Sequence, residues 1–129
     1  MPDAVHLAAI NTVLACLFTF FASYRVSAMR RAHEVKAPAT SGHPNFERAY
    51  RIHMNTVESL VLFLPLLWIG AILYSGLIAF ALGLLWLVGR MLYMMGYMAD
   101  PGKRAPGAYA SAFALVGLLV LSLLGIASI

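Results

Sequence analysis

The chain has 129 residues, of which 62% are hydrophobic and only 11% are charged, and its mean hydropathy is +0.84. A soluble domain of this length could not cover its surface with so few charges, so the composition excludes the soluble classes and indicates an integral membrane protein. The net charge of +4 is unevenly placed along the chain, which gives it topological meaning. We expect a single domain spanning residues 1–129.

Four apolar stretches are each long enough to cross a bilayer as a helix. With their polar extensions they predict helices at about residues 4–31, 45–74, 77–98 and 105–128. The first stretch should remain as a membrane helix, because Met1, Pro2 and Asp3 lack the basic start of a cleavable signal and the stretch is too long for one. The connection at 36–44 is short enough to join antiparallel helices. The sequence therefore predicts an all-α bundle of four antiparallel transmembrane helices.

All nine lysine and arginine side chains lie around the first and third connections between these helices. They are Arg25, Arg30, Arg31, Lys36, Arg48 and Arg51 at the first, and Arg90, Lys103 and Arg104 at the third. By the positive-inside bias both connections should face the cytoplasm, and both termini should face the opposite side. The same basic surface could hold an anionic ligand or lipid headgroups. Nothing in the sequence resembles a nucleic-acid-binding module.

The cysteine and histidine residues give no sign of a metal site or a disulfide framework. Cys16 is the only cysteine and sits in an apolar helix, where we expect it to be a poor nucleophile. His33 and His43 flank the first connection without the spacing of metal ligands, and we expect them to be solvated loop residues. Any thiol chemistry must therefore use a thiol from outside the chain.

The predicted helix 45–74 begins with a polar face. At ~1.5 Å per residue it would extend about 45 Å, so its polar start should project beyond the ~30 Å hydrocarbon slab. Arg48, Arg51, Asn55 and Glu58 recur at steps of three and four, which puts them on one side of the helix. This face is either a polar site or a set of mutually satisfied structural groups. Pro65 is expected to kink the apolar half of the helix.

The predicted helix 77–98 ends with Arg90, Tyr93 and Tyr97 on one face. Counted from the outer turn, Glu58 and Arg90 lie at depths of about 24 and 20 Å. An ion pair between them would explain both residues without a ligand, because ionisable groups at such depth are nearly always paired. It would not explain the other arginines, which outnumber the acids on that side: Glu34, Glu47, Glu58 and Asp100. Surplus guanidinium groups beside two phenols suggest an anion that carries carboxylates.

The predicted helix 105–128 follows Arg104, and Pro106 favours its initiation. Arg104 would then lie where the helix N-terminus adds its own positive potential. Small residues at a spacing of four allow close contact between helices and favour a bundle that forms an oligomer. The pairs are Gly107 with Ser111, Ala110 with Ala114, and Ala79 with Gly83.

A resemblance to a known family rests first on the polar start of the second helix, FERAYRIHMNTVE at residues 46–58. This segment resembles the MAPEG family, the membrane-associated proteins of eicosanoid and glutathione metabolism. The resemblance covers nearly the whole chain and includes SAMRRA at 27–32, GRMLYMMGY at 89–97 and KRAPGA at 103–108. The motifs look most like those of the microsomal glutathione transferases and leukotriene synthases.

The resemblance implies a homotrimer that binds glutathione between neighbouring subunits, at the cytoplasmic side. Five residues of one subunit would hold glutathione: Arg51, Asn55, Glu58, Tyr93 and Tyr97. Arg30 and His53 would contact it from the next subunit. Arg104 matches an arginine that stabilises the thiolate, and Arg31 matches one near the lipid substrate.

Four residues depart from the pattern of the family. Ser59 stands where relatives often have tyrosine, Leu60 and Val61 replace a frequent proline, and His53 replaces an amide or another family residue. These departures bear on the pose of glutathione and on the geometry of the second helix.

The function implied by the resemblance is a glutathione transferase, with glutathione peroxidase as a related activity. Glutathione would be the co-substrate, and a hydrophobic electrophile or lipid hydroperoxide would arrive from the membrane lipid. The charges agree, because glutathione has two carboxylates for arginines and one ammonium for Glu58. Two alternatives remain: a non-enzymatic lipid-binding scaffold on the same fold, and a small four-helix multidrug exporter. An exporter needs a membrane-embedded acid, and the only candidate, Glu58, lies near the membrane edge among arginines.

Overall fold

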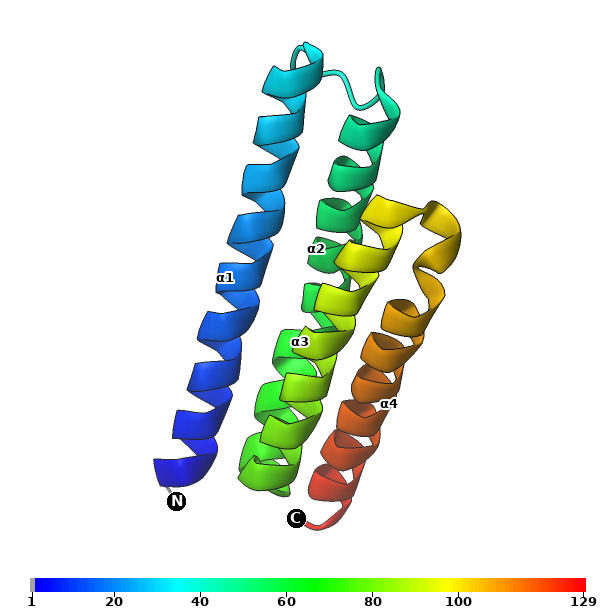
Figure 1. The fold of residues 1–129 in the computed structure, drawn as a ribbon. Helices are drawn as coiled ribbons and strands as arrows, with labels where there is room; N and C mark the ends of the chain where they lie inside the picture. The colour runs from blue at the N-terminus through cyan, green and yellow to red at the C-terminus, as the bar shows by residue number, and fades with distance from the viewer. Residues whose placement is uncertain (1) are drawn as a thin grey trace.

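The computed structural model describes residues 2–129. It contains four long helices, α1 (Pro2–His33), α2 (Pro44–Leu73), α3 (Gly76–Ala99) and α4 (Ala105–Ala127), with a short 3-10 helix, η1 (Pro101–Lys103), before α4 (Figure 1). No strand occurs among these residues, and all four helices are long and apolar enough to cross a membrane. The all-helical class with four membrane-spanning helices is therefore confirmed. The helix bounds lie within two residues of the ranges that we expected from the sequence.

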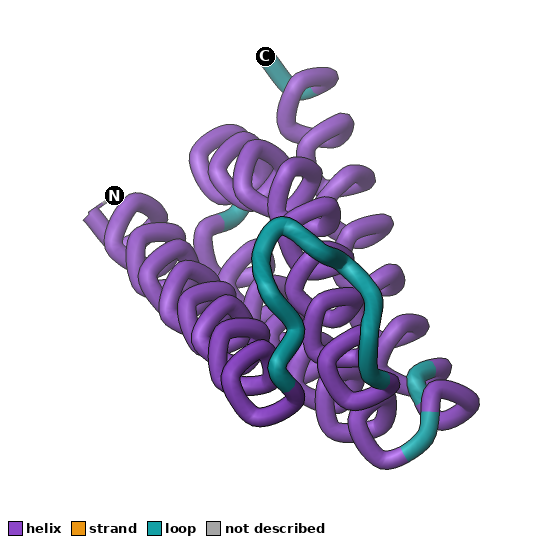
Figure 2. The backbone as a smooth tube through the Cα atoms, turned by 90° about the horizontal axis from the view of Figure 1, so that it is seen from above, coloured by secondary structure: helices purple, strands orange, loops and turns teal. Residues whose placement is uncertain are grey.

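The connections between the helices are short, and side chains within them cap the helices that follow. Ser75 caps α3 by accepting a hydrogen bond from the backbone N–H of Ile78 at 3.2 Å. Asp100 caps η1 in the same way through Gly102. Both termini lie at one end of the bundle, and the connection between α1 and α2 lies at the other (Figure 1). Seen from that second end, the connection arches over the space between α1 and α2 (Figure 2).

The connection between α1 and α2 differs from its expected form. His33 and His43 are half-buried, and their rings stack with centroids 3.5 Å apart and an interplanar angle of 11°. His43 also caps α2, because its Nδ1 accepts a hydrogen bond from the backbone N–H of Asn45. The expectation that both histidines are solvated loop residues is wrong, since His33 is the last residue of α1, His43 caps α2, and their rings pack on each other.

α1 packs through small residues and leaves its opposite side exposed. Ala8, Ala15 and Ala22 repeat every seven residues and are all buried, which lets α1 approach its neighbours closely. Val13 and Phe20, on the outer side, are exposed apolar residues, as expected for a surface that faces lipid.

Glycines bring α3 and α4 into backbone contact. A Cβ atom added at Gly89 would lie 2.6 Å from the backbone nitrogen of Ser111, and one added at Gly107 would overlap the backbone nitrogen of Tyr93. Gly83 has the same role against the side chain of Asn11 in α1. The predicted close contact at small residues is thus present, and it fixes the position of the α3 face that carries Tyr93.

All four helices contribute to the core, with Ala8 and Ala15 of α1 packed against the larger side chains of the other three. Phe63 and Trp86 stack with ring centroids 4.1 Å apart, and both are fully buried. The Trp86 indole N–H donates to Ser59 Oγ at 2.8 Å. α2 continues as a helix through Pro65 to Leu73. Ser59 of α2 is therefore tied to Trp86 of α3.

Candidate functional site

The predicted site residues lie mainly in one half of the bundle, which we call the basic half (residues 25–58 and 90–111). It contains the α1–α2 connection, η1 and all nine lysine and arginine side chains. The remaining helical residues form the apolar half. Three hollows are relevant to the site. The polar groove and the loop pocket open in the basic half, and the apolar groove adjoins the polar groove and lies in the apolar half.

The first hollow, the polar groove, runs between α2 and α4 over a floor that includes Arg90 of α3. Its volume is about 310 Å³. The residues that line it are Asn55, Glu58, Ser59, Leu62, Arg90, Ala108, Ser111, Ala112 and Leu115. Polar residues of α2, the buried guanidinium of Arg90 and the hydroxyl of Ser111 in α4 thus line one open space. This combination can bind a small polar or charged group.

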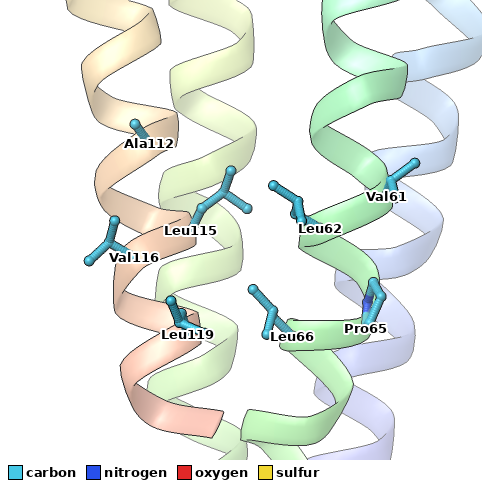
Figure 3. A pocket seen from close by; sticks show the side chains of 8 residues that line it. All are labelled: Val61, Leu62, Pro65, Leu66, Ala112, Leu115, Val116 and Leu119. Atoms are coloured by element: carbon cyan, nitrogen blue, oxygen red, sulfur yellow. The ribbon is translucent and has the colours of Figure 1, made fainter. Parts of the chain in front are cut away.

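The second hollow, the apolar groove, continues the polar groove toward the other end of the bundle. Both grooves are lined by Leu62, Ala112 and Leu115, so they are contiguous. The apolar groove has a volume of about 500 Å³. Leu62 and Leu66 of α2 point toward α4, and Leu115 points back toward them (Figure 3). The other lining residues are Val61, Pro65, Val116 and Leu119.

Arg90 is the most deeply buried charged residue in the described part of the chain, with 3% of its surface exposed. Its Nη2 donates to Asn55 Oδ1 at 2.8 Å, and its guanidinium carbon lies 4.3 Å from the centroid of the Tyr93 ring. Arg90 Nε is buried without a hydrogen-bond partner. The cation is therefore held by a neutral amide and an aromatic face.

The ion pair between Glu58 and Arg90 that would have explained both residues is absent. Within residues 2–129 the one ion pair joins Arg51 Nη2 to Glu58 Oε1 at 3.8 Å, and both side chains are more than half exposed. Glu58 and Arg90 line the same groove, but Arg90 donates its hydrogen bond to Asn55, one turn before Glu58. Because an exposed pair of this kind contributes little stability, both side chains remain available to a ligand.

A third hollow, the loop pocket, lies between the start of α2, the α1–α2 connection and η1, with a volume of about 510 Å³. Its lining is Thr40, Pro44, Glu47, Arg48, Tyr50, Arg51, Tyr97 and Pro101. Arg48 donates to the Met98 carbonyl at 3.1 Å and so ties α2 to the end of α3. Arg51 lines this pocket while pairing with Glu58 of the polar groove, so it connects the two hollows.

Tyr93, Tyr97 and Arg104 complete this group of contacts. The rings of Tyr93 and Tyr97 have centroids 5.5 Å apart, and the Arg104 guanidinium carbon lies 5.9 Å from the Tyr97 centroid. Arg104 is exposed at the start of α4 and donates to the Pro101 carbonyl at 2.7 Å. It therefore lies next to the helix N-terminus, where the positive helix potential is greatest.

Five predicted site residues line none of the three hollows. Tyr93 and Arg104 adjoin the loop pocket through their contacts with Tyr97, and the other three lie apart from it. Arg30 donates to the Ala39 carbonyl at 2.7 Å, with its guanidinium carbon 4.7 Å from the Phe46 ring centroid, so it holds the α1–α2 connection in place. Arg31 is exposed. His53 lines a separate groove between α1 and α2, which also contains Cys16.

The structure therefore brings six predicted residues together within one chain: Arg51, Asn55, Glu58, Tyr93, Tyr97 and Arg104. Sequence reasoning assigned Arg90 no part in the site, although it forms the floor of the polar groove and holds Asn55. The signal was present, because Arg90, Tyr93 and Tyr97 share one helix face. It was attributed to a pair with Glu58.

The MAPEG family model matches residues 8–124, a range that includes every residue of the three hollows. The chain belongs to the MAPEG family. Leukotriene C4 synthase of Cavia porcellus is 40% identical over 126 residues, which cover 98% of this chain and 84% of that protein. Microsomal glutathione S-transferase 2 of Homo sapiens is 36% identical over 126 residues, which cover 98% of this chain and 85% of that protein. The family predicted from the sequence motifs is thus confirmed.

Proposed function

We propose that this MAPEG protein is a membrane-bound glutathione transferase that adds the glutathione thiolate to hydrophobic electrophiles from the bilayer. The observation that carries the proposal is the continuity of the polar and apolar grooves through Leu62, Ala112 and Leu115. A charged peptide suits one end of this channel, and an apolar electrophile suits the other. The similarity to leukotriene C4 synthases and to microsomal glutathione S-transferase 2 supports the same activity.

Glutathione would bind through its charges. Arg51 is exposed and able to form a bidentate contact with a carboxylate. Glu58 would hold the ammonium group, and Asn55 would supply a hydrogen bond from the groove floor. Tyr97 would contact the peptide from the loop pocket, and Tyr93 from the position next to Arg90.

The chemical step requires a thiolate close to the electrophile. Arg104, at the N-terminus of α4, would lower the pKa of the glutathione thiol, and each unit of pKa corresponds to about 1.4 kcal/mol in favour of the thiolate. The sulfur then forms a bond to the electrophilic carbon while a halide leaves or an epoxide C–O bond opens. With a lipid hydroperoxide, two glutathione molecules would give the disulfide, the alcohol and water. Arg31 would act near the lipid substrate.

The assembly that we propose is a homotrimer of antiparallel bundles with the basic half at the cytoplasmic side and both termini opposite. Arg30 and His53 lie outside the hollows of their own chain, which suits a contact with glutathione held by a neighbouring subunit. Native mass spectrometry in mild detergent should give three copies per particle. A stable monomer that binds glutathione and turns over would contradict this assembly.

Two other functions make different demands on the same residues. A non-enzymatic lipid-binding scaffold needs only the apolar groove, and it has no use for the charged residues that line the polar groove. A proton-coupled exporter needs a sequestered acid. Glu58 is more than half exposed and lies 3.8 Å from Arg51, so it is poorly suited to that role.

The decisive experiment measures conjugation and peroxidase activity of the purified protein with glutathione and a panel of an aryl halide, an epoxide and a lipid hydroperoxide. We expect protein-dependent turnover of at least one of them, with heat-inactivated protein as the blank. Glutathione binding without any turnover would favour the scaffold. Absence of glutathione binding would rule out the proposed function.

A further inference from the structure

Arg90 is a buried cation whose hydrogen-bond partner is a neutral amide and not a carboxylate. A guanidinium inside a membrane span is costly and normally pairs with a carboxylate. Among residues 2–129 no carboxylate lies within ion-pair distance of Arg90. Its side chain instead contacts the amide of Asn55 and the ring of Tyr93. The buried charge of Arg90 is therefore directed at the Asn55 amide and not at a carboxylate.

The chemistry of the two groups fixes the orientation of the Asn55 amide. A guanidinium has only donors, so the amide atom that faces Arg90 must be the oxygen. The hydrogen bond to Asn55 Oδ1 at 2.8 Å is charge-assisted and stronger than one between neutral groups. The Asn55 Nδ2 atom has no hydrogen-bond partner among the described residues, and Asn55 lines the polar groove. The amide thus offers its two N–H groups to the groove.

Arg90 is itself held in one orientation. Its guanidinium lies over the Tyr93 ring, with a distance of 4.3 Å to the centroid, and α3 is fixed at this point because Gly107 of α4 packs on the Tyr93 backbone. Stacking of this kind depends on the planar shape of arginine, which lysine does not share. The orientation of Asn55 is therefore imposed by a rigid neighbour.

We infer that Arg90 is a positioning residue that makes Asn55 a hydrogen-bond donor, so that the polar groove takes a carbonyl or carboxylate oxygen of the peptide ligand at this point. A ligand N–H group at the same place is rejected, because Asn55 offers it no acceptor. This inference rests on the proposed function, since the ligand that it concerns is glutathione. It adds Arg90 to the site as the residue that turns the N–H groups of the Asn55 amide, and not its oxygen, toward the ligand.

The test replaces the donor without removing the partner of Arg90. Asn55→Asp keeps an oxygen toward Arg90, and the pair becomes a charged one, so the melting temperature Tm should not fall. The second carboxylate oxygen then faces the groove as an acceptor and opposes the ligand oxygen. Calorimetry should show glutathione binding weakened by about tenfold or more. Asn45→Asp is the matched control, because it makes the same charge change on an exposed residue of the same helix and should leave the binding unchanged.

A second variant removes the positioning group. Arg90→Met replaces the guanidinium with an unbranched apolar side chain, and this removes the hydrogen bond that orients the Asn55 amide. Because the proposed contact of Asn55 is with the peptide and not with the sulfur, KM for glutathione should rise about three- to tenfold while kcat stays within about twofold. Arg90→Lys, which can still donate to Asn55 Oδ1, should recover part of the loss. If Arg90→Met does not fold, Asn55→Asp alone carries the test.

The outcomes separate this inference from the proposed function. Weaker glutathione binding by Asn55→Asp at an unchanged or raised Tm supports the inference. If Asn55→Asp binds glutathione as the parent does, the inference is overturned while the glutathione site stands. A lowered Tm for Arg90→Met with unchanged KM assigns Arg90 to stability alone and also overturns it. If the parent protein binds no glutathione, the proposed function and this inference both fail.

Discussion

Buried polar groups behave differently in the two halves of the bundle. In the apolar half, Asn11, Trp68 and Ser122 each donate to an oxygen of a neighbouring helix, at 3.3, 2.9 and 3.0 Å. In the basic half, the structure leaves Arg25 Nε and Arg90 Nε buried without a partner, and they are the only such side-chain atoms within residues 2–129. Polar groups of the apolar half thus serve the contacts between helices.

The basic half contains more guanidinium groups than its carboxylates can pair with, and this excess of positive charge indicates that it binds an anionic ligand. Uncompensated cations in a membrane protein cost free energy, so a chain that keeps them gains something from a group that arrives later. An anionic peptide that enters the polar groove and the loop pocket, as we propose, would meet the exposed guanidinium group of Arg51. Loss of a buried polar contact in the apolar half should therefore affect stability alone, whereas changes to the charged residues of the basic half should affect glutathione binding and chemistry.

The largest effect is expected where the α3–α4 contact supports both halves. Gly107→Ala would drive a Cβ atom into the Tyr93 backbone, which cannot rotate away as a side chain can. We expect a loss of about 3 kcal/mol in the free energy of unfolding, at the upper end for overpacking. The measurement is unfolding in detergent. Gly102→Ala is the control, because the added Cβ would meet its nearest atom at 3.5 Å; equal stability of both variants would contradict the tight contact.

A change confined to the basic half is Arg51→Ala. It removes the bidentate carboxylate contact that we propose, and a charged hydrogen bond is worth roughly 1.5–3 kcal/mol, or about 10- to 150-fold in the dissociation constant for glutathione. Isothermal calorimetry checks this, with Lys36→Ala as the control for loss of one positive charge on the exposed connection. Unchanged affinity in a folded Arg51→Ala protein would remove Arg51 from the site.

Arg104 separates binding from chemistry within the basic half. Arg104→Ala should leave the affinity for glutathione within about threefold, yet reduce the ultraviolet thiolate absorbance of the complex by about tenfold at neutral pH. Turnover should fall with the absorbance and recover in part at high pH, where the thiol ionises without help. Lys103→Ala, at the neighbouring position, should change neither quantity. If the absorbance is the same with and without Arg104, this arginine only anchors α4.

The smallest effect is expected in the apolar half. Ser122→Ala removes a hydrogen bond to the Leu66 carbonyl, and bonds of this kind between membrane helices are worth about 0.6 kcal/mol. The free energy of unfolding should fall by about that amount, and the affinity for glutathione should stay unchanged. A loss of glutathione binding in Ser122→Ala would contradict this separation and would mean that the two halves are coupled.

The sequence was sufficient for the fold class because its signals are local. Apolar runs give the four helices, and steps of three and four residues place Arg51, Asn55 and Glu58 on one face. Small residues also indicated the close approach of α3 and α4. These properties depend on neighbours within one or two turns, and the structure agrees with them.

The partners of individual charges could not be predicted in this way. Counting residues gives the depth of Arg90 but not its direction around the helix axis, so Glu58 and Asn55 were both within reach. The outcome depends on how α2 rotates against α3, which is set by contacts such as the stack of Phe63 on Trp86. Arg30 shows the same limit, because its bond to the Ala39 carbonyl depends on the path of the connection.

The central claim is that the basic half binds glutathione as a thiolate. The most direct measurement is an ultraviolet difference titration of the purified parent protein with glutathione at neutral pH, with S-methyl glutathione as the control that cannot ionise. We predict a saturable thiolate band with the same dissociation constant as calorimetry gives, and no band with the S-methyl compound. Saturable glutathione binding without the band, or no binding at all, would contradict the account.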